Sequence, residues 1–187
     1  MKEDLFKALE VLKQGGIILY PTDTIWGIGC DATNEEAVEK IYAIKKREKN
    51  RSMLILVDNS AKVQNYVQDV PDIAWDLIDL TDKPLTIIFN GAKNLAPNLI
   101  STDGSIGIRV TSEDFSRELC YRFRNPIVST SANFTGKSSP QNFNEIDPKI
   151  IEMVDYVVTY RQDEIIKQSP SSILKIGSKG DVQIIRK

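Results

Sequence analysis

Helical and strand-like apolar patterns alternate along the whole chain, and this order constrains the fold more than any single residue does. Apolar residues repeat at helical spacing over residues 3–14, and a short apolar run suited to a strand follows at 17–20. A mixed order of helices and strands is typical of an α/β protein, whose sheet need not be purely parallel. A chain of 187 residues can bury a full core, so we expect a single domain over residues 1–187.

The same patterns place the remaining elements. Asn34 stands where it can cap a second helix, whose apolar residues run from 37 to 44. Ser112 stands where it can cap another helix that runs to Phe123. Further helical patterns cover 60–67, 71–80 and 144–153. Apolar runs that suit strands cover 53–57, 85–89, 106–110, 127–128, 155–159, 172–176 and 182–186.

The chain contains no histidine, and this excludes several classes of site. A Ser-His-Asp triad, a Cys-His pair and a His-ligated zinc site all need an imidazole. The two cysteines, Cys30 and Cys120, lie far apart and do not form the dense framework of a disulfide-rich domain. We therefore expect two buried or half-buried thiols, and we predict no metal site.

Acidic and basic residues nearly balance, with a net charge of −2, so the overall charge does not favour a nucleic-acid-binding protein. The N-terminus leads directly into a helix pattern and is no signal peptide. No apolar run approaches the ~20 residues of a membrane span. We therefore expect a cytoplasmic protein that makes no membrane contact.

Cations nevertheless gather at the end of the second predicted helix. They suit either a solvated helix end or the neutralisation of a triphosphate. These cations are Lys45, Lys46, Arg47, Lys49 and Arg51.

A polar loop with threonines and an aspartate (Thr22–Thr24) precedes a glycine-rich segment that contains Gly27 and Gly29. The glycines nearly match a dinucleotide-binding fingerprint. That fingerprint needs its glycines directly after a strand and at the start of a helix, whereas here the polar loop intervenes and the helix begins later. A glycine-rich turn that packs Trp26 inward would explain the glycines but not the two threonines and the aspartate beside them, which are candidate ligand contacts.

Two further segments carry groups that suit phosphate or carboxylate. Ser131–Ser138 is similar to a P-loop, but Pro140 and the extended run before it argue against the helix that a P-loop needs. Its hydroxyls and the Asn133 amide remain candidate donors. Arg109 suits either fork-like binding of a carboxylate or a surface ion pair on an edge strand. Together these groups indicate a nucleotide-using enzyme rather than an acyl hydrolase.

Several segments, in their order along the chain, resemble the signature of the YrdC-like family. They are Pro21–Ala32, Lys45-x-Arg47, Pro84–Thr86, Gly107–Val110, Ser129–Asn133, Pro170–Ile173 and Ile185-Arg186. Trp26 stands where the family usually has tyrosine or phenylalanine, and Glu48 stands where a proline is common. The resemblance covers nearly the whole chain.

The resemblance implies a fold and a reaction. The fold is a YrdC-like open, twisted mixed sheet with flanking helices and a large, positively charged concave cleft. The reaction joins L-threonine, bicarbonate and ATP into threonylcarbamoyl-AMP and releases pyrophosphate, which makes the enzyme a nucleotidyltransferase. Partner proteins then modify tRNA with the threonylcarbamoyl group, on the adenosine next to the anticodon. Magnesium is expected to arrive with ATP, and weak binding of tRNA or double-stranded RNA belongs to the same expectation.

By the same resemblance, residues are assigned to the two large substrates and to catalysis. The residues that hold L-threonine are Thr24, Arg109, Ser131 and Ser171, of which Arg109 pairs with the carboxylate. The residues that hold ATP are Arg47, Arg51, Ser105, Asn133, Gln141 and Arg186. The catalytic residues, which stabilise charge on the phosphates, are Lys45 and Arg47.

Two alternatives to the synthase are open. The YciO-like branch shares the cleft but tends to lose the Lys-x-Arg motif and the Ser-Ala-Asn triplet, both of which this chain keeps. A non-catalytic RNA-binding module would use the basic run at 45–51. Against this second alternative stand the acidic pI, near 5.3, and the lack of a face that combines aromatic and basic residues.

Overall fold

The computed structural model describes residues 1–46, 53–177 and 180–187. Its strands are β1 (Ile18–Tyr20), β2 (Gly27–Gly29), β3 (Leu54–Val57), β4 (Leu85–Phe89), β5 (Ile106–Val110), β6 (Ile127–Ser131), β7 (Tyr156–Val157), β8 (Ser172–Ile176) and β9 (Val182–Arg186). Its α-helices are α1 (Lys2–Lys13), α2 (Glu35–Lys45), α3 (Asp72–Leu80), α4 (Asp114–Phe123) and α5 (Pro148–Met153). Short 3-10 helices are η1 (Ser60–Asn65), η2 (Pro97–Leu99) and η3 (Phe143–Glu145).

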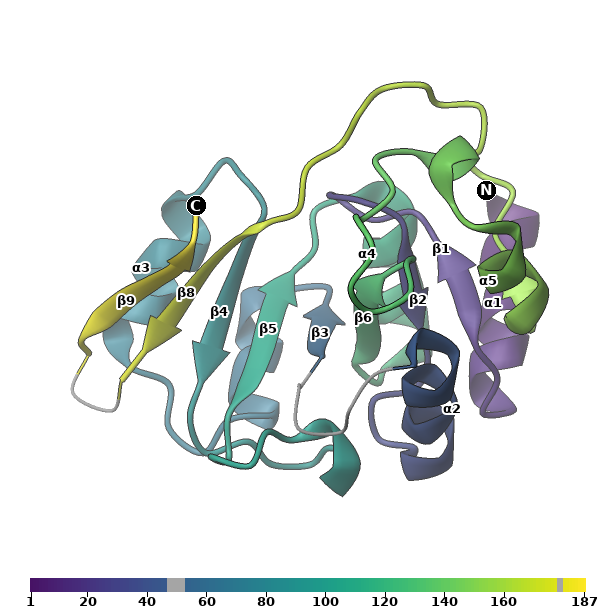
Figure 1. Cartoon of the computed structure of the whole chain (residues 1–187). Helices are drawn as coiled ribbons and strands as arrows, with labels where there is room; N and C mark the ends of the chain where they lie inside the picture. The colour runs from purple at the N-terminus through teal and green to yellow at the C-terminus, as the bar shows by residue number, and fades with distance from the viewer. Residues whose placement is uncertain (47–52, 178–179) are drawn as a thin grey trace.

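Within the described residues, nine strands form one sheet in the order β7-β1-β2-β6-β3-β5-β4-β8-β9 (Figure 1). Parallel pairs join β1 to β7, β3 to β5 and β4 to β8, whereas the other neighbours run antiparallel. The sheet is therefore mixed, and the predicted α/β class with a large mixed sheet and flanking helices is confirmed.

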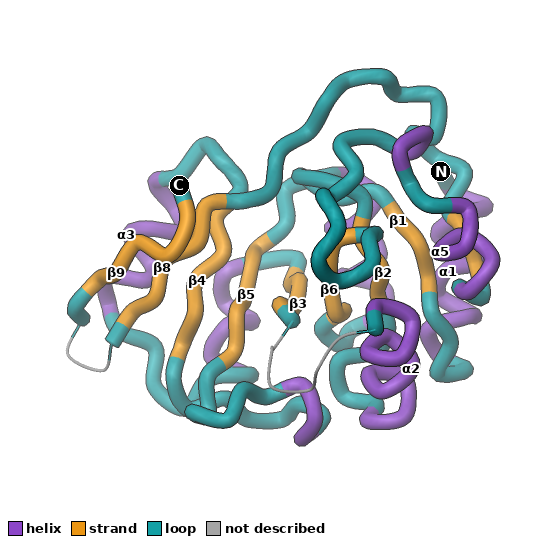
Figure 2. Tube along the Cα trace, viewed as in Figure 1, coloured by secondary structure: helices purple, strands orange, loops and turns teal. Residues whose placement is uncertain are grey.

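The two faces of the sheet are covered differently. Along β4, Leu85 and Phe89 line hollows that residues of α3 also line, whereas Thr86 and Ile88 point to the opposite face and line a cavity. In Figure 2 the helices α3 and α4 lie behind the strands, and long loop segments cross above them. The face that these helices leave open is the one on which the candidate site lies.

The segment Gly27–Gly29 is a strand, so the alternative of a glycine-rich turn is wrong. β2 pairs with β1 on one side and with β6 on the other. A Cβ on Gly29 would lie 2.6 Å from the Val128 carbonyl oxygen and 2.7 Å from Cε1 of Tyr20. The Tyr20 hydroxyl reaches the same carbonyl at 3.2 Å. The Tyr20 ring packs against β2 and β6, and the glycines of β2 leave room for it.

One predicted helix cap is confirmed and the other is wrong. The Asn34 side chain accepts a hydrogen bond from the Ala37 N–H at 3.0 Å, as expected for the cap of α2. At α4 the cap is Glu113 and not Ser112, because the Glu113 carboxylate accepts the Ser116 N–H at 2.7 Å. A negative charge at the start of a helix also interacts favourably with the helix dipole.

Both cysteines are free and fully buried, as expected. Burial raises the pKa of the Cys30 thiol and of the Cys120 thiol, so both remain protonated at neutral pH. They belong to the hydrophobic core, in which they behave as small apolar side chains.

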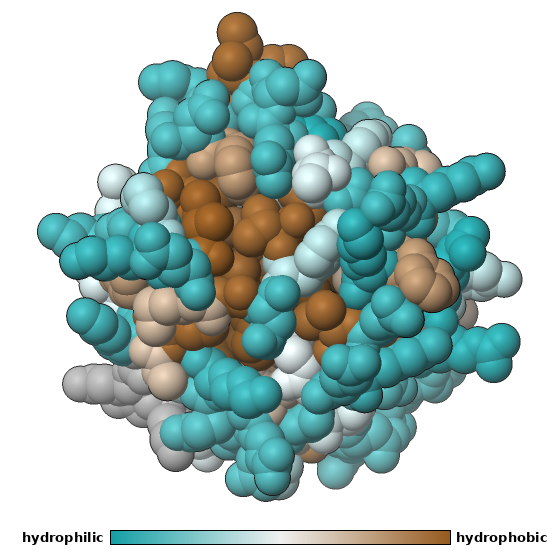
Figure 3. All heavy atoms as spheres, turned by 90° about the vertical axis from the view of Figure 1, so that its right-hand side faces the viewer, coloured by the Kyte–Doolittle hydropathy of each residue, from teal (hydrophilic) through white to brown (hydrophobic). Residues whose placement is uncertain are grey.

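The surface beside α1 and α5 carries an apolar area surrounded by hydrophilic residues (Figure 3). Exposed apolar side chains of these two helices are Phe6 and Met153. None of the helices in the described part of the chain has the length and apolar character that a membrane span requires.

Candidate active site

A cavity of about 240 Å³ lies on the open face of the sheet. This volume is slightly below the ~300–1,000 Å³ of pockets that take drug-sized ligands. Its walls come from segments far apart in sequence. The polar lining residues are Thr24, Thr86, Arg109, Ser129, Thr130, Ser131, Ser139, Ser171 and Arg186, and the other side chains that line it are mostly apolar, including Ile25, Trp26, Met53, Leu54, Ile88 and Ile173.

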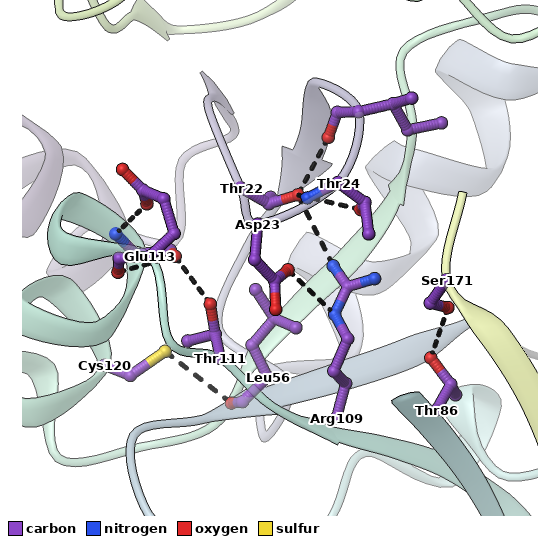
Figure 4. A network of polar contacts seen from close by, with 12 residues as sticks. Thr22, Asp23, Thr24, Leu56, Thr86, Arg109, Thr111, Glu113, Cys120 and Ser171 are labelled. Atoms are coloured by element: carbon purple, nitrogen blue, oxygen red, sulfur yellow. Dashed lines mark hydrogen bonds and ion pairs between the residues drawn. The ribbon is translucent and has the colours of Figure 1, made fainter. Parts of the chain in front are cut away.

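Arg109 is buried in the middle of the sheet, with 3% of its surface exposed. Its strand, β5, lies between β3 and β4, so the alternative of a surface ion pair on an edge strand is wrong. Nε lies 3.2 Å from Oδ1 of Asp23, and Nη2 donates to the Thr22 hydroxyl at 3.4 Å (Figure 4). The guanidinium group is therefore held by the β1–β2 loop on one side while it lines the cavity on the other.

The Asp23 carboxylate faces Arg109 and is largely shielded from water. Its carboxylate is as buried as the guanidinium, and the close approach of the two groups lacks the geometry of a hydrogen bond. Burial raises the pKa of the Asp23 carboxyl group, and the charge of Arg109 opposes that shift. The pair therefore positions two charges without a directed hydrogen bond between them, so the guanidinium remains available to a second anion.

Thr24 is presented to the cavity by a tightly turned loop. The Thr22 hydroxyl donates to the Ile25 carbonyl oxygen at 2.8 Å and accepts the Thr24 N–H at 3.1 Å. Such side-chain bonds to nearby backbone are typical of threonine in turns. Trp26 lines the cavity as well, and the centroid of its ring lies 4.9 Å from the centroid of the Phe143 ring.

Ser131 ends β6, which is longer than the predicted strand at 127–128. Its hydroxyl donates to the Asn133 side-chain oxygen at 2.5 Å, and the Asn133 amide donates to the Lys137 carbonyl oxygen at 2.6 Å. The structure shows turns rather than a helix at 132–140, so the argument from Pro140 against a P-loop helix is confirmed. Asn133 orders this loop and is not among the residues that line the cavity.

Lys45 joins two of the sequence motifs in space. Its ammonium group donates to the carbonyl oxygens of Ser131 and Asn133 and, at 3.2 Å, to the Asn133 side-chain oxygen. The side chain is 2% exposed and does not line the cavity. This geometry differs from the expectation that Lys45 faces phosphate, because its ammonium group is surrounded by protein oxygens. Arg47 and Arg51 lie outside the described residues.

Ser171 and Arg186 reach the cavity from the C-terminal hairpin. The Ser171 hydroxyl lies 2.8 Å from that of Thr86, and Nε of Arg186 donates to the Ser171 carbonyl oxygen at 2.9 Å. Burial lowers the pKa of Arg186, and the charge of Arg109 adds to this shift. The two cations are thus close enough to repel one another, and an anion between them would relieve that repulsion.

Ser105 and Gln141, both predicted to contact ATP, do not line this cavity. The Ser105 hydroxyl donates to Asp103 Oδ1 at 2.6 Å, and this bond, together with one from Lys175, lowers the pKa of Asp103 to about 2. Gln141 lies in a small neighbouring hollow that Arg161 also lines.

Sequence reasoning did not assign a role to Thr86, Ser129 or Thr130, although all three line the cavity. Thr86 could have been found from strand alternation, because it is a polar residue between apolar neighbours in the run 85–89. Ser129 and Thr130 belong to the family motif, but they lie in the part of β6 that extends beyond the predicted strand at 127–128.

The cavity is suited to anions. Its described lining has two arginines and several hydroxyl groups but no carboxylate. Among the described residues, no group of three or more histidine, cysteine, aspartate or glutamate side chains is arranged to hold a metal ion. Buried guanidinium and hydroxyl groups can orient a carboxylate or a phosphate and stabilise charge that develops on it.

Comparison with known proteins identifies related sequences along almost the whole chain. The family model Sua5_yciO_yrdC, described as "Telomere recombination", matches residues 10–187. A protein of Methanocaldococcus jannaschii named "Putative threonylcarbamoyl-AMP synthase" is 39% identical over 180 residues, which is 94% of this chain and 83% of that protein.

Solved structures share the fold at lower sequence identity. E. coli YciO superposes with a TM-score of 0.86 at 23% identity, and the match covers 100% of this chain and 90% of that one. P. abyssi Sua5 in complex with L-threonine superposes with a TM-score of 0.82 at 19% identity. That match covers 92% of this chain but only 50% of the Sua5 chain.

Proposed function

Because the chain belongs to the Sua5/YciO/YrdC family, we propose that it synthesises threonylcarbamoyl-AMP from L-threonine, bicarbonate and ATP, with release of pyrophosphate. The observation that carries the proposal is the convergence of Thr24, Arg109, Ser131 and Ser171 on one cavity. These residues come from four separate segments, and each was assigned to L-threonine from its motif alone. The P. abyssi Sua5 complex supports the same amino acid as the ligand.

In this proposal Arg109 holds the L-threonine carboxylate. Its guanidinium group is planar and matches a carboxylate in a two-pronged arrangement, and its burial strengthens the attraction. Thr24, Ser131 and Ser171 orient the rest of the amino acid. Among the described residues, the absence of a carboxylate from the cavity lining avoids repulsion of the substrate's own carboxylate.

The nucleotide is proposed to lie beside the amino acid. Arg186 lines the cavity, and Ser105, Asn133 and Gln141 are proposed as further ATP contacts together with Arg47 and Arg51. Lys45 holds the Ser131–Asn133 loop, and its charge adds to the field that attracts phosphate, while Arg47 is proposed to act on the phosphates directly. Magnesium enters with ATP, because such metal ions are bound largely by phosphate oxygens and water.

The proposed reaction has two bond-forming steps. The threonine amine attacks bicarbonate and, with loss of water, gives a carbamate. A carbamate oxygen then attacks the α-phosphorus of ATP, and pyrophosphate leaves. Positioning and charge stabilisation account for most catalysis of such transfers, which suits a site without a histidine. The adenylate is proposed to pass in the cytoplasm to partner proteins that modify tRNA.

The test is an assay of pyrophosphate release with L-threonine, labelled bicarbonate and ATP, each omitted in turn. We expect release only when all three are present, together with a labelled adenylate. Release that continues without L-threonine would contradict the proposal. The YciO-like alternative, supported by the likeness to E. coli YciO in fold alone, predicts no release under the same conditions.

A further inference from the structure

Two buried hydroxyl groups form a pair on the cavity wall beside Arg109. The Thr86 hydroxyl, from β4, and the Ser171 hydroxyl, from the residue before β8, lie 2.8 Å apart (Figure 4). Thr86 is 2% exposed and Ser171 is 3% exposed, yet both line the cavity. Neither the motifs nor the reaction proposed above gives Thr86 a role.

The pair has unused hydrogen-bonding capacity. Each hydroxyl has one donor and two lone pairs. The hydrogen bond within the pair uses one donor and one lone pair, so one O–H and three lone pairs remain. Among the described residues, no other hydrogen bond engages either hydroxyl. A donor left without a partner in a buried place costs free energy, so this wall favours a ligand that can both donate and accept.

The register of the sheet puts Thr86 directly beside Arg109. β4 and β5 are antiparallel with Ile87 opposite Ile108, so the next residues along, Thr86 and Arg109, are also opposite each other. Both point to the cavity face. Directly opposite residues have Cβ atoms about 4.5–5.5 Å apart. An α-amino acid whose carboxylate lies on Arg109 therefore occupies the cavity that the Thr86 hydroxyl also lines, and its side chain can extend toward that hydroxyl.

The neighbouring wall is apolar. Leu54, Ile88 and Ile173 line the cavity around the hydroxyl pair, and Ile173 is the cross-strand partner of Thr86. A wall that combines a donor and acceptor pair with aliphatic side chains matches a side chain that carries both a hydroxyl and a methyl group. A side chain of the same shape without the hydroxyl would leave the pair unsatisfied.

We infer that Thr86, acting with Ser171, is a specificity-determining residue that recognises the β-hydroxyl group of the amino-acid substrate. This inference rests on the proposed function and adds a second recognition element to the carboxylate contact of Arg109. The contrasting explanation is that the pair only fastens β4 to the start of β8. That role would affect stability but not the choice between amino acids.

The experiment compares L-threonine with L-2-aminobutyrate, which has the same carbon skeleton but no hydroxyl. The value of kcat/KM for pyrophosphate release is measured with each amino acid for the wild type, Thr86→Val and Thr86→Ser. We expect Thr86→Val to reduce the preference for L-threonine by at least tenfold, because valine replaces the hydroxyl by a methyl group of similar size. Thr86→Ser keeps the hydroxyl and is expected to retain most of the preference.

Thr111→Val is the matched control. Thr111 and Ser116 form another buried hydroxyl pair at 2.8 Å, and Thr111 does not line this cavity. If the Thr86 pair were only a fastening, both valine variants would lower the melting temperature and leave the preference unchanged. That result for a folded Thr86→Val would overturn the inference.

Binding measurements separate this inference from the proposed function. Calorimetric titration of the wild type with each amino acid needs neither turnover nor the variants. Binding of L-threonine at least tenfold tighter than that of L-2-aminobutyrate supports the inference even if no pyrophosphate is released, which would contradict only the synthase. Equal binding of the two amino acids by the wild type overturns the inference, whether or not the valine variant folds.

Discussion

Arg109 shows why residue type matters more than charge at this site. Its guanidinium group reaches Asp23 with one edge and Thr22 with one nitrogen, and it lines the cavity at the same time. A lysine could keep the positive charge near Asp23, but it presents a compact ammonium group without the planar fork. Substitution of Arg109 by lysine therefore tests the geometry of the guanidinium group separately from its charge.

Arg109→Lys is expected to raise the KM for L-threonine by roughly 10- to 100-fold, on the order of the loss of one charge-assisted hydrogen bond. The fold should persist because a positive charge remains beside Asp23. Steady-state pyrophosphate release at saturating ATP measures the KM, and circular dichroism checks the fold. Arg117→Lys, on the exposed side of α4, is the control and should leave the KM unchanged. An unaltered KM in Arg109→Lys would show that the fork does not hold the carboxylate.

At the scale of elements, the packing of β2 depends on the absence of Cβ atoms at its two glycines. A Cβ on Gly29 meets a backbone oxygen that cannot move away, whereas a Cβ on Gly27 would first meet the Ser129 hydroxyl at 3.0 Å, which can rotate. We expect Gly29→Ala to lower the free energy of unfolding by about 1–3 kcal/mol, and Gly27→Ala to lower it by less. Urea denaturation of the two variants makes the comparison. Equal losses would show that the close approach to Val128 is not what requires glycine.

The same strand shows what the sequence could and could not reveal. Apolar periodicity was sufficient to locate β3, β4 and β5 and most of the helices, because those segments bury their side chains in regular patterns. β2 carries two glycines and one isoleucine, so it offers no alternation to detect. Ser112 and Glu113 are adjacent candidates for one cap, and only the geometry of the α4 terminus distinguishes them.

The candidate site was predictable from motifs only in part. Thr24, Arg109, Ser131, Ser171 and Arg186 line the cavity. The placement of Lys45 under the Ser131–Asn133 loop depends on contacts across 86 positions of sequence, which no local pattern encodes. The pairing of Thr86 with Ser171 depends in the same way on the register between β4 and β8.

Asp4 ties α1 to β7 and to the segment that follows it. Its carboxylate accepts bonds from the Tyr156 hydroxyl at 2.9 Å and from the Thr159 N–H at 2.7 Å. Burial alone would raise the pKa of Asp4, but these hydrogen bonds outweigh burial and lower it below the ordinary 3.8. A carboxyl group with a lowered folded-state pKa stabilises the protein above pH 3.8, and this stabilisation is lost as the pH falls through the folded-state pKa.

Asp4→Ala is therefore expected to lower the free energy of unfolding by about 2 kcal/mol at pH 7, because it removes buried bonds to a charged group. The difference from the wild type should shrink as the pH falls below 3.8. Urea denaturation at pH 7 and at pH 3 measures both values. Glu10→Ala, at an exposed position of α1, serves as the control. A difference that is independent of pH would show that the charge of Asp4 contributes nothing.

At the scale of the whole molecule, the cavity is assembled from segments that extend from Thr24 to Arg186. Strand pairing is continuous from β7 at one edge of the sheet to β9 at the other. Ligand binding should consequently stabilise the sheet as a unit, in keeping with the proposal of a single domain over residues 1–187.

We expect one cooperative thermal transition, and a rise in its midpoint of roughly 10–20 °C when L-threonine and ATP are each present at about 100 times their dissociation constants. Differential scanning calorimetry measures both properties. Arg109→Lys should show a smaller shift with L-threonine at the same concentration. Two separate transitions, of which only one responded to ligand, would contradict the single domain.

The parallel pairing of β4 with β8 has a consequence for protein synthesis. Ser171 and Arg186 lie far behind Thr24 in the sequence, so the ribosome adds them much later. N-terminal parts of a chain can fold while the rest is still being made, but here the cavity has no complete wall until the C-terminal hairpin is in place. A nascent chain therefore cannot use its ligand to stabilise a folding stage that precedes the synthesis of this hairpin.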